Sequence, residues 1–292
     1  MGETRALLGT NVDRHDRLSC ELAIWADVVL ESGLLAFASQ RSNELRLRPP
    51  GELARRWGIP DWAMKRACAG LRKEGVLSDL MSHLDRYIVL KPAAFLRGLS
   101  LRLSRRLGQA VLLNLPPALR GQSPEKIIEA ISHALKSADE GAVAILHTAL
   151  AVEASWLARA KVYSGPGPVA LALSGDDLRD AAAALNLTRL KARSRERSKD
   201  NPLGLPDGFA YADLLVFSRR PDVKLRIDVG PWAHPAPDRP IVRPVNPVAN
   251  ALLLSLFPLR GEEAAERLVE ILHENLKARE EGLYVGPADR HP

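Results

Sequence analysis

Residues 44–90 constrain the fold most, because strong helix-starting and helix-ending residues occur there at close intervals. Pro49-Pro50 predicts a helix start, since a proline in the first turn loses no hydrogen bond that the helix would make. Gly58 predicts the end of that helix in a left-handed conformation, which glycine adopts readily. A second helix then follows, with Asp61 as its candidate N-cap. We therefore expect two short helices joined by a tight turn.

The apolar spacing predicts how these helices pack. Ala63, Ala67 and Leu71 recur every fourth residue and predict a buried face of the second helix. The face opposite them is made by Trp62, Lys65, Arg66 and Ala69. Two β-like runs, VLSDL and RYIVL, follow this helix and predict a hairpin. Before it, residues 18–39 predict a helix with a broad apolar face that packs beneath the other two.

The spacing L-A-x-x-x-G-I followed by A-x-x-x-L-x-x-E-G-V-L resembles winged helix-turn-helix domains of bacterial regulators and plasmid replication initiators. The resemblance covers about 50 residues. It implies that the second helix enters the DNA major groove, where Trp62, Lys65 and Arg66 would meet base edges. Arg86, in the hairpin, would contact the DNA backbone or minor groove. The alternative is a winged helix that contacts only other proteins.

Residues 169–230 repeat the order of this pattern. Val169 to Leu173 predicts a strand, Ser174 an N-cap, and Asn186 a left-handed residue at the helix end. Thr188 is a candidate N-cap of a further helix. That helix would present the basic residues Arg189, Lys191, Arg193, Arg195 and Arg197.

Two runs, YADLLVFS and VKLRIDVG, then predict a second hairpin with a basic tip. Its DNA-contacting residues would be Arg219, Arg220 and Lys224. We expect a second winged helix here, although the helix after Thr188 lacks an apolar back beyond Leu190 and Ala192. The alternative is a solvated charged loop in an α+β domain.

The expected fold is α+β and mainly helical, with tandem winged helix-turn-helix domains joined by a helical segment. Residues 1–92 would form the first domain, 93–164 the helical connection and 165–292 the second domain with its Pro-rich loop and C-terminal helix. A helix is expected over 93–115, where Arg105 and Arg106 would either contact phosphates or line its solvated side.

The distribution of charge favours a polyanionic partner. The net charge is +6, yet residues 41–120 alone sum to +10 and residues 186–245 to +5. Clustered positive charge is typical of nucleic-acid-binding proteins. The two cysteines show no metal-binding spacing, and no signal peptide or membrane-spanning run is evident, so a cytoplasmic protein without a membrane partner is expected.

Motifs for catalysis are not evident: the sequence has no phosphate-binding glycine loop, no H-x-x-x-H pair and no G-x-S-x-G. We therefore expect a non-enzymatic protein without a cofactor, which binds specific double-stranded DNA, with a homodimer as a further expectation. The resemblance favours plasmid replication initiation. The alternatives are transcription regulation, with one winged helix and a dimerisation or ligand-sensing domain, and protein interaction.

Overall fold

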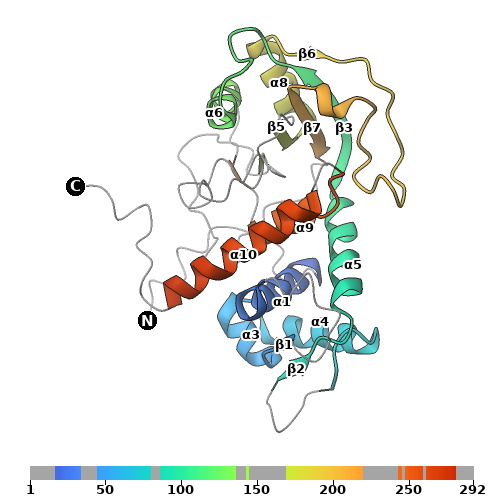
Figure 1. Cartoon of the computed structure of the whole chain (residues 1–292), viewed down its shortest axis with the longest axis vertical. Coiled ribbons are helices and arrows are strands. Elements are labelled where there is room, and N and C mark those ends of the chain that lie inside the picture. The colour runs from blue at the N-terminus through green and yellow to red at the C-terminus, as the bar shows by residue number, and fades with distance from the viewer. Residues whose placement is uncertain are drawn as a thin grey trace, which may run out of the picture.

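The fold is α+β and consists of a helical body and a body built on a six-stranded sheet (Figure 1). The computed structural model describes residues 17–33, 45–79, 86–135, 143–144, 169–219, 243–244, 247–258 and 261–280. None of the helices among these residues is long and apolar enough to cross a membrane.

The helical body is arranged around one buried helix. Its elements are α1 (Arg17–Ser32), β1 (Arg46–Leu47), α3 (Pro50–Trp57), α4 (Asp61–Lys73) and β2 (Tyr87–Ile88). Every residue of α1 from Leu18 to Leu30 is buried, so this helix is covered on all sides. The predicted helix over 18–39 is thus confirmed as far as residue 32, and residues 34–44 lie outside the described part.

The turn between α3 and α4 has the predicted conformation. Pro50 is the first residue of α3, and Gly58 ends it with a φ of 61°. The amide of Ile59 donates to the carbonyl of Ala54 at 3.0 Å, and the Ile59 side chain is buried beneath the turn. The prediction that Asp61 is the N-cap is wrong: Pro60 holds that position, and Asp61 is the first residue of α4.

The predicted hairpin after α4 is confirmed in part: its second run contains strand β2, whereas its first run forms only an isolated bridge between Leu77 and Val89. β1 and β2 pair antiparallel, with Leu47 opposite Tyr87. The chain after α4 runs beside β2 without forming a strand, and the amide of Ser78 donates to the carbonyl of Ile88 at 2.9 Å. Residues 80–85, at the hairpin tip, lie outside the described part.

A single helix over 93–115 is a wrong prediction. α5 (Pro92–Ser104) ends after Ser104, and Leu107–Asn114 form strand β3. The run VLLNL is apolar without a clear period, and such a run fits a buried strand as well as a helix. Strand pairing decides the outcome here, because β3 lies between β6 and β7 in the sheet.

The large sheet draws strands from both of the expected C-terminal segments. The strands are β3 with β4 (Val143–Ala144), β5 (Val169–Leu173), β6 (Thr188–Arg189), β7 (Leu214–Arg219) and β8 (Arg243–Pro244). Their order is β6-β3-β7-β5-β4-β8, with β5–β7 and β4–β8 parallel. All five residues of β5 are buried, as expected of a central strand with a parallel neighbour.

Helices α6 (Pro124–Ala134) and α8 (Gly175–Leu185) lie together beside β5 and β7 (Figure 1). α8 is predicted by its capping residues, and α6 falls within residues 93–164, the expected helical connection. Ser174 caps α8 by accepting a hydrogen bond from the amide of Asp177, and Asn186 ends α8 with a φ of 54°, both as expected. Ser123 occupies the N-cap position of α6 without a side-chain cap hydrogen bond.

The predicted second recognition helix is wrong. Thr188 and Arg189 form β6 instead, and residues 190–208 contain no helix. The short 3₁₀-helix η3 (Phe209–Tyr211) follows, and then β7, which confirms the first strand of the predicted second hairpin. Residues 220–242, including the expected second strand, lie outside the described part, so the structure holds no counterpart of α4 between residues 188 and 219.

Two C-terminal helices join the helical body to the sheet. α9 (Pro247–Leu254) and α10 (Gly261–Glu280) lie between the two bodies and pack against α1 and α5 (Figure 1). The expected C-terminal helix is confirmed as α10, whose Leu268, Ile271 and Leu272 are buried. His273 of α10 lies with Nδ1 3.0 Å from the carbonyl oxygen of Leu30, at the end of α1 where carbonyls lack helical partners.

The contact between α10 and the end of α1 allows a test by paired glycine substitutions. Gly33 has a φ of 54°, and a Cβ there would lie 2.9 Å from Cγ of His273. Gly58 has a similar φ of 61° with nothing within 4 Å of its would-be Cβ. Gly58→Ala should therefore cost only the left-handed strain, about 1 kcal/mol, whereas Gly33→Ala adds about 1–3 kcal/mol of overpacking.

Denaturant unfolding measures both changes in free energy of unfolding. Adding His273→Ala should reduce the Gly33→Ala penalty to that of Gly58→Ala, because the ring that collides is gone. An equal penalty for Gly33→Ala with and without His273 would contradict this contact.

Candidate nucleic-acid interface

Helix α4 presents the predicted face to solvent. Ala63, Ala67 and Leu71 are buried against α1 and α3, which fixes the rotation of α4 about its axis. The opposite face carries Trp62, whose exposed fraction of 55% is high for a tryptophan, together with exposed Lys65 and Arg66. The structure therefore brings together the first three predicted contact residues on one surface.

Two of these side chains differ in how they are held. Lys65 forms an ion pair with Asp61 one turn earlier, with Nζ 2.5 Å from the carboxylate oxygen. Both groups are well exposed, so this pair contributes little and can be exchanged for a stronger anion. Arg66 forms no ion pair or side-chain hydrogen bond within the described residues, so its guanidinium is open to a ligand.

Sequence reasoning missed one arginine of this surface. A groove of about 450 Å³ runs between α1 and α4, lined by Arg17, Cys20, Trp62, Ala63, Arg66, Ala67 and Gly70. Arg17 lies across this groove from Arg66 and is held by Glu21, at 2.7 Å, and by Glu74. Hydrogen bonds to Glu74 and then Glu21 raise the pKa of Arg17, so it stays charged. Arg17 lies 57 residues before Glu74, and nothing in the sequence indicates that the two residues pair at the end of α4.

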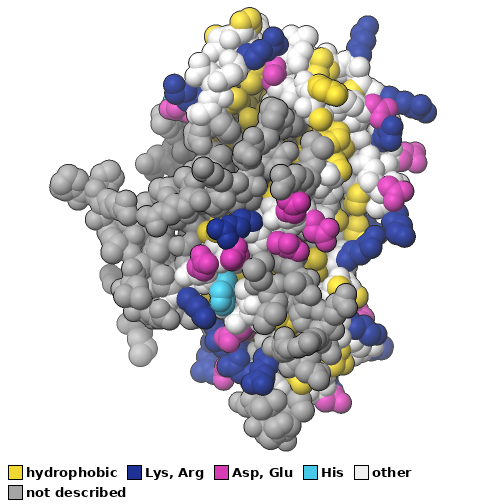
Figure 2. Space-filling model, in the orientation of Figure 1, with side chains coloured by type: hydrophobic (Ala, Val, Ile, Leu, Met, Phe, Trp, Pro, Cys, Tyr) yellow, Lys and Arg dark blue, Asp and Glu magenta, His cyan; other side chains and the backbone are white. Residues whose placement is uncertain are grey.

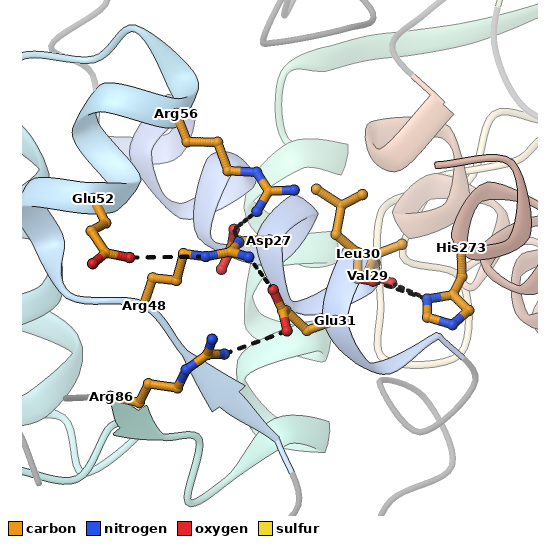
Figure 3. Close-up of polar contacts among 9 residues, drawn as sticks. All are labelled: Asp27, Val29, Leu30, Glu31, Arg48, Glu52, Arg56, Arg86 and His273. Atoms are coloured by element: carbon orange, nitrogen blue, oxygen red, sulfur yellow. Dashed lines mark hydrogen bonds and ion pairs between the residues drawn. The ribbon is translucent and has the colours of Figure 1, made fainter. Parts of the chain in front are cut away.

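Arg86 has a different role from the one predicted. It begins the last strand of the hairpin, and its guanidinium lies 3.4 Å from the carboxylate of Glu31 on α1 (Figure 3). Arg86 is partly buried and joins the hairpin to α1. In the described structure Arg86 therefore takes part in an ion pair that holds the hairpin on α1, in addition to being a candidate DNA contact.

A buried carboxylate holds α1, β1 and α3 together. Asp27 of α1 is fully buried and accepts a hydrogen bond from Arg48 at 2.6 Å, with Arg56 of α3 at 3.4 Å (Figure 3). Arg48 stands just before α3 and also pairs with Glu31. The other carboxylate oxygen of Asp27 has no hydrogen-bond partner within the described residues. Burial therefore raises the pKa of Asp27 to about 6, against the opposing effect of Arg48.

This carboxylate makes stability depend on pH in a defined window. The folded protein holds a proton on Asp27 up to about pH 6, whereas an unfolded aspartate releases it near pH 4. The folded state thus binds more protons between these values, and its free energy of unfolding should fall by about 3 kcal/mol as the pH rises from about 4 to about 6. Asp27→Asn should remove this fall.

Denaturant unfolding at several pH values measures it, with Asp61→Asn as the control. Asp61 is an exposed carboxylate on α4, and replacing it leaves Asp27 and its two arginine partners in place, so the fall between about pH 4 and 6 should remain. A slope in Asp27→Asn equal to that of Asp61→Asn would contradict the assignment.

Arg105 and Arg106 do not lie beside α4. They connect α5 to β3, at the opposite end of a helix about 20 Å long. Arg105 is exposed and lies near Arg197. Burial lowers the pKa of Arg197, and the positive charge of Arg105 lowers it further. The predicted phosphate contacts of the helix end therefore belong to the sheet body.

The remaining basic residues of the second body lie on an extended segment. The side chains of Arg189, Lys191, Arg193, Arg195 and Arg197 are all exposed. Arg195 pairs with Asp207, and Arg197 donates to the backbone carbonyls of Leu107 and Gly108. Arg219 ends β7, while Arg220 and Lys224 lie outside the described part.

Comparisons with known proteins give no relative: no family model, no curated protein and no solved structure matches the chain. No group of three or more potential metal ligands occurs among the described residues. The surfaces of α4 and of the extended segment are therefore the features of the described structure that bear on function.

Proposed function

We propose that the protein binds specific double-stranded DNA through a winged helix formed by residues 17–90, with α4 in the major groove. The observation that carries the proposal is the exposed face of α4. A fixed helix presenting Trp62, Lys65 and Arg66 on the side away from its core is what major-groove reading requires.

The roles of the individual side chains follow from their chemistry. Arg66 is open and planar, and can donate two hydrogen bonds to one guanine edge. Lys65 would exchange Asp61 for a base acceptor or phosphate, and Trp62 would make an apolar contact. Arg17, across the groove at the start of α1, would contact a phosphate of the flanking backbone.

The biological process depends on the second body. We retain plasmid-type replication initiation as the proposed process, because the second body carries an exposed basic segment suited to DNA beside the site that α4 reads. Transcription regulation is the second candidate. It is favoured by the structure of residues 188–208. An initiator of this kind would use a second recognition helix there, and the structure has extended chain instead.

A single substitution on α4 tests DNA reading. Selection from random duplexes defines the preferred site, and affinity is then measured for that site and for one altered base pair at a time. Arg66→Ala should weaken binding to the preferred site by about 1–3 kcal/mol and relax the preference at one position. The control is Arg179→Ala, which removes an exposed helical arginine paired with Asp176 on α8 and should leave both unchanged.

Two outcomes would contradict the proposal. One is that Arg66→Ala changes the footprint and the base preference no more than the Arg179→Ala control does. The other is no duplex binding, or binding without salt dependence, which would favour a protein-interaction role because phosphate contacts must release counterions.

A further inference from the structure

An ordered basic segment forms the edge of the six-stranded sheet. β6 pairs with β3 through Arg189 opposite Leu113, and the amide of Leu190 then donates to the carbonyl of Leu112 at 2.9 Å. Further along, Ser194 contacts Gln109, and Arg197 donates to the carbonyl of Gly108 at 3.2 Å. The segment from Arg189 to Arg197 thus follows β3, through backbone pairing at its start and through side-chain bonds from Ser194 and Arg197 further along.

Alternation along this segment separates charged from apolar side chains. Leu190 and Ala192 are half-buried and pack against the core, whereas Arg189, Lys191 and Arg193 are exposed. In an extended chain, side chains two residues apart share a face and stand about 7 Å apart. Arg189, Lys191 and Arg193, which we call the basic strip, therefore form a straight row of positive charge.

The loop that follows holds the strip in place. Asp207 pairs with Arg195, and its amide donates to the carbonyl of Arg193 at 3.2 Å. Asn201 closes the loop with two 2.9 Å hydrogen bonds to the backbone of Leu205, whose side chain is buried. An anchored strip loses less conformational entropy on binding than a flexible basic arm would.

The charges of the strip are not neutralised within the described part of the chain. Arg189, Lys191 and Arg193 form no ion pair or side-chain hydrogen bond with any residue that the structure describes. Figure 2 shows Lys and Arg side chains projecting from the margin where the segment after β6 runs in Figure 1. Arg195 and Arg197, by contrast, are engaged as anchors. A row of unneutralised cations implies an anionic partner with evenly spaced charges.

We propose that the basic strip binds the phosphate backbone of single-stranded DNA. A single strand can lie straight along a row of cations. A strand of a duplex instead curves: over the two phosphate steps that the strip spans, it winds through roughly 0.2 of a helical turn, so its phosphates depart from a straight row. The choice of DNA over RNA rests on the proposed function of α4. When α4 holds a DNA duplex that opens, the nearest single strand is a strand of that same DNA.

An exposed aromatic side chain beside the segment supports a single strand. Tyr211 of η3 has an exposed fraction of 90% and follows four residues after Asp207, which bonds to the strip. Proteins that bind single strands combine a basic track with aromatic rings on which bases stack, and a duplex offers no unstacked base to such a ring.

The test compares strand and duplex binding by the full chain. Probes are labelled oligomers of thymidine and of uridine, each about 20 nucleotides long, and the preferred duplex of α4. Replacing Arg189, Lys191 and Arg193 together with serine should weaken thymidine-oligomer binding at least tenfold. It should also flatten the slope of log affinity against log salt by about 2, the value for three phosphates. The double variant Arg189→Lys and Arg193→Lys, with Lys191 unchanged, should keep most of the affinity.

The matched control removes the same net charge elsewhere. Lys126, Arg179 and Lys277 are exposed on helices outside the strip, and their joint replacement with serine should leave strand binding within about twofold. Tyr211→Ala should weaken strand binding roughly fivefold or more without changing the salt slope, while Tyr211→Phe should retain it.

The outcomes separate this inference from the proposed function. Arg66→Ala should weaken duplex binding only, and the strip variant should weaken strand binding more than duplex binding. Equal effects of the strip and control variants on the thymidine oligomer would overturn the inference. Three other results would also overturn it. Loss of duplex affinity alone would indicate a duplex-binding surface, and tighter binding of the uridine oligomer would indicate an RNA-binding surface. Full competition by a polyglutamate peptide would indicate a surface for an acidic protein.

Discussion

The buried carboxylate of Asp27 is the interaction on which the geometry of the helical body depends. It lies on α1, yet its two arginine partners come from the chain before α3 and from α3 itself. Removing two charges from water offsets much of the attraction between them, so such a pair adds little net stability. Its effect is on arrangement: only one placement of α3 on α1 leaves the carboxylate paired, and α4 follows α3 through a turn with little freedom.

A second buried carboxylate links α1 to the rest of the chain. Glu21 is also fully buried, and it accepts from Arg17 at 2.7 Å and from Arg102 of α5 at 2.5 Å. Arg17 in turn pairs with Glu74 at the end of α4. The two buried acids of α1 therefore orient α3, α4 and α5 around one helix. The sequence shows Glu21 and Asp27 among apolar residues of this helix, and only the folded chain shows which arginines neutralise them.

Local signals account for the parts of the fold that the sequence predicted correctly. Pro50, Gly58 and the four-residue spacing of Ala63, Ala67 and Leu71 act within single elements, so the α3–α4 pair and the exposed face of α4 could be predicted. The segment after Asn186 was predicted wrongly, although its signal was present. Basic residues at every second position from 189 to 197 have the period of an extended chain, and comparison with the first helix-turn-helix outweighed that period. Pairing with β3 depends on residues about 75 positions earlier, which no local pattern shows.

The two candidate surfaces are joined without a flexible linker. α5 starts beside the hairpin that flanks α4, and only Arg105 and Arg106 separate its last turn from β3, whose edge the basic strip follows. α9 packs on α5, α10 packs on α1, and the ion pair of Glu21 with Arg102 fixes α5 against α1. A distance set by one helix and the start of one strand cannot change without breaking these contacts. DNA bound at both surfaces must therefore accommodate a fixed separation, so a duplex read by α4 would present its opened strand to the strip at a set distance from the recognised bases.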